Sequence, residues 1–179
     1  MKDVIFITGN QHKADFLAKR LGMQIEHRKI DLDEIQSLDP RAVTEHKVRQ
    51  AYAVAKRPVL VEDIALTFTA MKRLPGTFIK WFLEELGTDG LCRLADGLAH
   101  REAVATVCYG FYDGKRLQFF ESRISGQVAA HPRGDHGFGW DSIFIPEGAT
   151  KTYGEMTPDE AWPLSLRAPT LKKLREFLA

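Results

Sequence analysis

The sequence has few cysteines, almost no net charge and no long apolar segment. Its two cysteines, Cys92 and Cys108, match neither a metal-site spacing nor a disulfide framework, so we expect buried free thiols in a reducing compartment. The 25 basic and 24 acidic residues leave a formal charge of +1, which argues against a nucleic-acid polymer or a membrane surface as partner. No segment approaches the roughly 20 apolar residues of a membrane span, and the N-terminal apolar run is too short for a signal peptide. We therefore expect a cytoplasmic protein.

The length and the apolar content predict one domain, residues 1–179, because 44% hydrophobic residues in 179 suffice for a substantial core. The hydrophobic period changes from 3.6 to 2 near Ala103, which predicts helices and strands in the first half and successive antiparallel strands after it. The expected fold is α/β, with a central twisted mixed sheet, flanking helices and two lobes with a cleft between them. Strands are expected at 4–7, 24–31, 59–63, 104–112, 117–124 and 126–130, and helices at 12–21, 41–55, 78–86, 88–98 and 165–178.

Two adjacent acids follow the apolar run 59–61. The run predicts a buried strand, and we expect that strand to end at Glu62 and Asp63. Carboxylates in such a place can hold a hard divalent cation or accept a proton from water. Two solvated side chains at a strand end are the alternative.

A tight polar turn, Thr8-Gly9-Asn10, joins the first expected strand to the first helix. Backbone N–H groups and the positive end of the helix dipole favour phosphate at such a turn, and Lys13 adds a full charge one turn into the helix. The glycine spacing fits neither a Walker loop nor a dinucleotide fingerprint. An ordinary helix capped by Asn10 is equally compatible with this stretch.

Eight short motifs in series resemble the inosine triphosphate pyrophosphatase family of the Ham/Rdg type, house-cleaning purine nucleoside triphosphate pyrophosphatases. The resemblance covers nearly the whole chain and rests on TGNQHK (8–13), KIDLDE (29–34), VLVED (59–63), LPG (74–76), IKWF (79–82), SG (125–126), FGWD (138–141) and TYGEM (152–156). It implies Mg²⁺-dependent hydrolysis of deaminated purine nucleoside triphosphates (ITP, dITP, XTP) to the monophosphate and pyrophosphate. It also implies a homodimer.

The resemblance assigns roles position by position. Asp63 corresponds to the metal-binding proton acceptor, with Glu62 as a catalytic helper, and Glu34 corresponds to a magnesium ligand. The substrate-binding positions that it implies are Thr8, Gly9, Asn10, Lys13, Lys47, Lys80, Phe138, Gly139, Trp140, Asp141, Ser165 and Arg167.

The chain departs from the family pattern near its C-terminus. Ala161 stands where the family has a lysine, and Leu166 stands where it has the histidine of a Ser-His-Arg motif; Ile64 replaces a small hydroxyl residue. In the family that the chain resembles, this lysine and histidine help to read the base, so we expect the departure to affect selectivity more than phosphate chemistry. Two alternatives follow: a pyrophosphatase for a different nucleotide, or a nucleotide-binding protein with low turnover.

Overall fold

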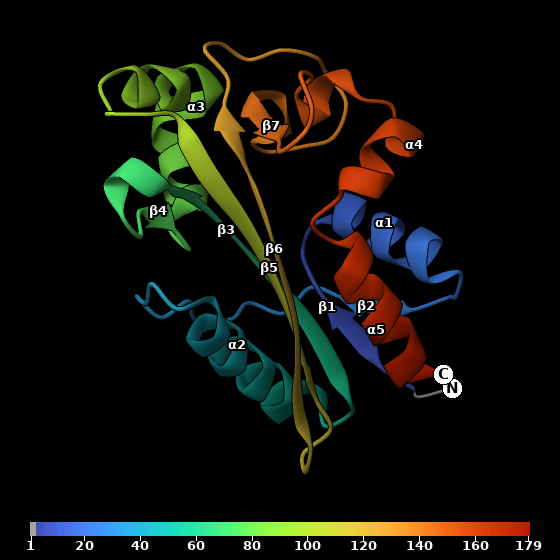
Figure 1. Cartoon of the computed structure of the whole chain (residues 1–179). Coiled ribbons are helices and arrows are strands. Elements are labelled where there is room, and N and C mark those ends of the chain that lie inside the picture. The colour runs from blue at the N-terminus through green and yellow to red at the C-terminus, as the bar shows by residue number, and fades with distance from the viewer. Residues whose placement is uncertain (1–2) are drawn as a thin grey trace. The chain divides into compact units, whose positions relative to one another are not determined.

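The computed structural model describes residues 3–179 and divides the chain into two compact units (Figure 1). Unit 1 consists of the chain up to Asp63 together with Val107–Ser122 and Pro169–Ala179, and unit 2 consists of Ile64–Thr106 and Arg123–Ala168. Among the described residues, no helix is both long enough and apolar enough to cross a bilayer.

A mixed sheet of seven strands runs through the chain, which confirms the α/β prediction. Its strand order is β2-β1-β3-β5-β6-β7, with β4 paired to β3. β1 pairs in parallel with β2 and β3, whereas β4 and β7 pair antiparallel with β3 and β6. The strands are β1 (Ile5–Ile7), β2 (Glu26–Arg28), β3 (Val59–Phe68), β4 (Pro75–Gly76), β5 (Glu102–Tyr112), β6 (Leu117–Val128) and β7 (Phe144–Pro146).

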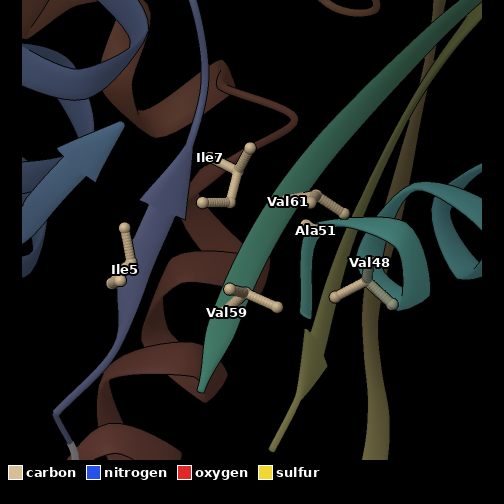
Figure 2. Close-up of a cluster of buried hydrophobic side chains, with 6 residues drawn as sticks. All are labelled: Ile5, Ile7, Val48, Ala51, Val59 and Val61. Carbon is tan, nitrogen blue, oxygen red and sulfur yellow. The ribbon is translucent and has the colours of Figure 1, made fainter. Parts of the chain in front are cut away.

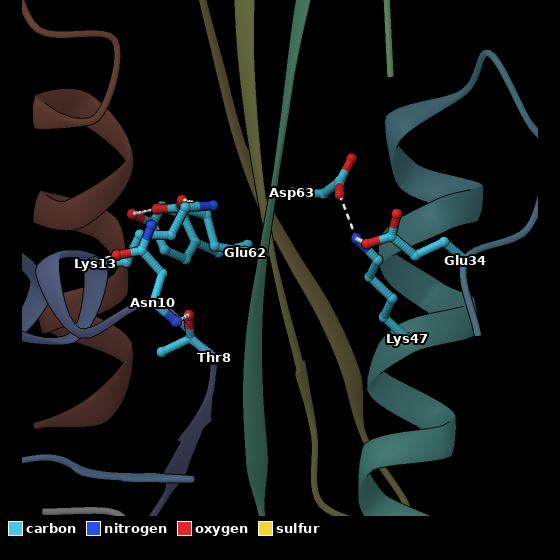
Figure 3. A network of polar contacts seen from close by, with 8 residues as sticks. Thr8, Asn10, Lys13, Glu34, Lys47, Glu62 and Asp63 are labelled. Atoms are coloured by element: carbon cyan, nitrogen blue, oxygen red, sulfur yellow. Dashed lines mark hydrogen bonds and ion pairs between the residues drawn. The ribbon is translucent and has the colours of Figure 1, made fainter. Parts of the chain in front are cut away.

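In unit 1, α1 (Gln11–Leu21) and α5 (Ala168–Leu178) lie on one side of the strands and α2 (Pro40–Ala55) lies on the other (Figures 1 and 3). Branched side chains of β1 and β3 pack against α2, as expected for strands buried on both faces (Figure 2). The cluster contains Ile5, Ile7, Val48, Ala51, Val59 and Val61. α2 also packs closely on β5, because a Cβ built at Gly110 would lie 2.5 Å from Thr44 Cγ2.

Unit 2 contains α3 (Ile79–Asp96), α4 (Pro158–Ala161), strands β4 and β7, and parts of β3, β5 and β6. α3 is broken at Gly87, whose φ of 64° and ψ of 179° leave the helical region. The sequence prediction of two helices, 78–86 and 88–98, agrees with this break.

The prediction that a strand ends at Glu62 and Asp63 is wrong. β3 continues for ten residues, Val59–Phe68, and the acids lie in its middle. Acidic residues are unfavourable in strands, so the local sequence pattern indicates a strand end at this point. Pairing with β1, β4 and β5 overrides that local preference. The separate strand expected at 126–130 is likewise the end of β6.

Candidate active site

Glu62 and Asp63 leave β3 on opposite faces. Successive side chains of a strand alternate in direction, so two adjacent acids in mid-strand cannot share one face. In Figure 3, Glu62 points toward α1 and Asp63 points toward α2. Unit 1 therefore has two acidic groups with separate partners.

Asp63 shares a cation with Glu34. The ammonium of Lys47 lies 2.7 Å from Asp63 Oδ1 and 2.9 Å from Glu34 Oε1. The side chains of Lys47 and Asp63 are only 13% and 11% exposed. Burial raises the pKa of the Asp63 carboxyl, although Lys47 opposes this shift. A carboxylate with a raised pKa is a better proton acceptor than an exposed one.

α2 carries Lys47, the partner of Asp63, and holds the loop that carries Glu34. The helix begins after Asp39, whose side chain accepts a hydrogen bond from Arg41 N, with Pro40 in the first turn. Gln50 of α2 forms two hydrogen bonds with the loop that carries Glu34: Asp33 N donates to Gln50 Oε1 at 3.0 Å, and Gln50 Nε2 donates to Asp33 O at 3.3 Å. One helix thus positions both Lys47 and the loop of Glu34.

Glu62 forms the second group, with Lys13 and Tyr109. Lys13 Nζ lies 2.9 Å from Glu62 Oε1, and the Tyr109 hydroxyl donates to Glu62 Oε2 at 2.5 Å. The Glu62 side chain is 3% exposed. Sequence reasoning missed Tyr109. The sequence feature that points to Tyr109 is a hydroxyl within an otherwise apolar strand, since buried tyrosines usually have a hydrogen-bond partner.

Two side-chain hydrogen bonds order the turn before α1. Asn10 caps α1 by accepting a hydrogen bond from Lys13 N at 3.3 Å, and Thr8 Oγ1 accepts one from Asn10 N at 3.1 Å. A Cβ built at Gly9 would lie 3.4 Å from Cγ of Lys29, so the backbone at Gly9 is close to the Lys29 side chain. The capped-helix and the phosphate-site interpretations are therefore compatible, because the cap leaves other N–H groups of the first turn available.

Unit 2 holds the residues 138–141 in a tight loop. Asp141 Oδ2 accepts a hydrogen bond from Phe138 N at 2.9 Å, and Gly139 between them has a φ of 67°. Burial raises the pKa of Asp141, whereas the Phe138 hydrogen bond and Arg167 lower it. The Arg167 guanidinium lies 5.5 Å from the centre of the Phe138 ring. Trp140 is buried and packs edge-on against Phe144.

Of the other expected site residues of unit 2, Ser165 is linked to the loop 138–141, whereas Lys80 lies on α3. Ser165 Oγ accepts a hydrogen bond from Arg167 N at 3.2 Å, which joins it to the Phe138 loop through Arg167. Lys80 is exposed on α3, with its ammonium 4.8 Å from the centre of the Trp81 ring. Leu166, at the position of the family histidine, is buried.

The carboxylates of unit 1 fit a divalent cation of the magnesium type. Among residues 3–179, no group of three or more His, Cys, Asp or Glu side chains is arranged to hold a metal. Magnesium, however, is commonly bound through one or two carboxylates, with water and substrate phosphates completing the shell. Glu34 and Asp63 supply such a pair, and Asp63 Oδ2 is buried without a hydrogen-bond partner among the described residues.

Comparisons with known proteins agree with these observations. The inosine triphosphate pyrophosphatase of Schizosaccharomyces pombe is 42% identical over 182 residues, covering 99% of this chain and 96% of the relative. Inosine triphosphate pyrophosphatase 2 of Trypanosoma cruzi is 40% identical over 176 residues, covering 96% and 90%. A HAM1 protein from Coxiella burnetii has the same fold, with a TM-score of 0.86, 21% identity and coverage of 99% and 98%.

The family match spans the same length. The sequence profile described as the Ham1 family matches residues 4–177, which include both acidic groups and the loop 138–141. With two relatives at 40% identity or more, each covered over at least 90% of its length, the family prediction is confirmed. This chain therefore belongs to the Ham1 family.

Proposed function

We propose that this protein hydrolyses deaminated purine nucleoside triphosphates, such as ITP, dITP and XTP, to the monophosphate and pyrophosphate. It is a hydrolase acting on an acid anhydride. The observation that carries the proposal is the ion-paired group Glu34–Lys47–Asp63, in which Lys47 and Asp63 are nearly buried, in a chain of this family. Pyrophosphate release needs both a proton acceptor and neutralised phosphate charge.

In this proposal Asp63 accepts the proton of the water that attacks the α-phosphorus. Burial supports that role because it raises the pKa of the carboxyl. Lys47 and Lys13 bind phosphate oxygens, and each is already paired with a carboxylate that orients it. Lys80, exposed on α3, is a further proposed substrate-binding lysine. Glu62 assists through Lys13 rather than by touching the water.

The proposed cofactor is Mg²⁺, held by Glu34 and Asp63. A magnesium ion held by these two carboxylates would neutralise phosphate charge and would lower the pKa of a bound water. The turn Thr8-Gly9-Asn10 contributes backbone N–H groups at the start of α1 to the same polyphosphate.

Unit 2 is proposed to bind the base. Phe138 and Trp140 supply aromatic surface, Gly139 allows a close backbone approach, and Asp141 offers a carboxylate. Ser165 and Arg167 complete the set, with Arg167 stacked on Phe138. Since Ala161 and Leu166 replace two polar side chains, we expect weaker discrimination against other bases than a site with polar partners gives.

Three further properties belong to the proposal. The chain acts as a single domain of this family over residues 1–179, supported by the family match over 4–177. It forms a homodimer and works in the cytoplasm, where its two buried free thiols remain reduced. Neither a nucleic-acid polymer nor a membrane is a partner, in keeping with the net charge of +1.

A pyrophosphate-release assay with a panel of nucleoside and deoxynucleoside triphosphates tests the function. Preferred turnover of ITP, dITP and XTP supports it. Preference for another base favours the alternative substrate, and nucleotide binding without pyrophosphate release favours a binding protein.

Asp63→Asn tests the assigned proton acceptor in the same assay. Lys47 keeps its partner Glu34 in this variant, so the protein should fold while turnover falls by about 10²–10⁴. Asp89→Asn, at an exposed position of α3, is the matched control and should retain wild-type turnover. An Asp63→Asn variant as active as wild type would show that the assignment is wrong.

A further inference from the structure

Tyr109 is connected to Lys13 through the carboxylate of Glu62. The tyrosine sits on β5, is completely buried, and donates its hydroxyl to Glu62 Oε2. The other oxygen of that carboxylate, Oε1, pairs with the Lys13 ammonium at 2.9 Å. All three residues belong to unit 1, and Figure 3 shows Glu62 and Lys13 beside the start of α1.

We propose that Tyr109 is a positioning residue for polyphosphate binding: its hydroxyl fixes Glu62, and Glu62 in turn holds the Lys13 ammonium at the start of α1. The inference rests on the proposed function, because it takes the triphosphate of the substrate as the ligand of Lys13. Neither the family motifs nor the sequence pattern assigns a role to position 109.

The geometry explains why a tyrosine is suited to this role. A buried ring cannot change rotamer without displacing its neighbours, so its hydroxyl is a fixed point. The hydrogen bond that it donates to a carboxylate is charge-assisted, the stronger class. Glu62 is thereby held at both oxygens, one by Tyr109 and one by Lys13.

Lys13 is the member of this group that can reach a ligand. Its side chain is 23% exposed, against 3% for Glu62. Its own backbone N–H is bound by the Asn10 cap, so the stem begins at a fixed place in the first turn of α1. A flexible lysine loses conformational entropy when it binds phosphate, and an ammonium already oriented by Glu62 loses less. Loss of the Tyr109 hydroxyl should therefore weaken phosphate binding rather than the chemical step.

Tyr109→Phe removes one oxygen atom and keeps the ring, so it tests the hydroxyl alone. We expect the KM for ITP in pyrophosphate release to rise about tenfold, and kcat to change by less than about threefold, since a charged hydrogen bond is typically worth a factor of this order. Calorimetric binding of inorganic tripolyphosphate should weaken by a similar factor. Unchanged KM and unchanged tripolyphosphate affinity would overturn the inference.

A second experiment uses Lys13→Met, because Tyr109 is proposed to act on polyphosphate binding by way of Lys13. In a Lys13→Met background, Tyr109→Phe should add no further loss of tripolyphosphate affinity. A full additional loss there would mean that the hydroxyl acts on the fold generally, which also overturns the inference.

Tyr112→Phe is the matched control on the same strand. Its hydroxyl donates to Gly114 O at 3.2 Å, in the turn after β5, and its loss should leave KM and tripolyphosphate affinity at wild-type values. The failure of the proposed function gives a different pattern: the wild-type protein would release no pyrophosphate from any nucleotide, whatever the tripolyphosphate results for the Tyr109 and Lys13 variants.

Discussion

Replacing Lys47 by methionine should destabilise the protein and make its stability depend on divalent cations. The ammonium lies within 2.9 Å of both Glu34 and Asp63, and Lys47 and Asp63 are nearly buried. Methionine keeps the length of the stem but leaves two carboxylates without that cation. Breaking a buried ion pair in this way costs about 3–5 kcal/mol. For a chain of this size, that loss lowers Tm by about 6–20 °C.

Mg²⁺ or Mn²⁺ should restore part of the thermal stability that Lys47→Met loses. A divalent cation can take the place of the ammonium between the two carboxylates. At a concentration 100 times its Kd, such a ligand restores about 2.7 kcal/mol, which is about 5–11 °C in Tm. The wild-type protein should respond less in the absence of nucleotide, because Lys47 already neutralises Glu34 and Asp63.

Thermal unfolding followed by circular dichroism, with and without MgCl₂, measures both effects. Lys151→Met is the matched control: Lys151 pairs with Glu160 at 2.8 Å, but both side chains are about half exposed, so the change should lower Tm much less than Lys47→Met does. The prediction is wrong if Lys47→Met unfolds at the wild-type temperature, or if magnesium raises the Tm of Lys47→Met and of the wild-type protein equally.

Three further predictions concern unit 1 and the thiols. Asn10→Ala should cost about 1 kcal/mol in the free energy of unfolding, because it removes the cap of α1; urea denaturation measures it. Leu174→Ala should cost about 2–5 kcal/mol by the same method, since Leu174 is fully buried on α5. Cys92 and Cys108 should not react with a thiol reagent in the native protein, whereas both should react in denaturant: each is buried, and burial raises the pKa of Cys108 to about 11. Fast native labelling of either cysteine would contradict this prediction.

The family, the fold class and the local structure of α1 are predictable from the sequence alone. The series of motifs identified the Ham1 family, and the family match over residues 4–177 confirms it. The Asn10 cap and the helix break near Gly87 were also readable, because both depend on the chemistry of a few neighbouring residues. The roles of the individual site residues remain predictions.

Which partner each of the two acids meets depends on the tertiary structure. Pairing between distant segments extends β3 through Glu62 and Asp63, and the alternation of a strand then sends one acid toward Lys13 and the other toward Lys47. Tyr109 is 47 residues from Glu62 along the chain, and their contact depends on how the strands pair. Strand pairing is set by packing across the whole sheet, so no local pattern could have predicted that hydrogen bond.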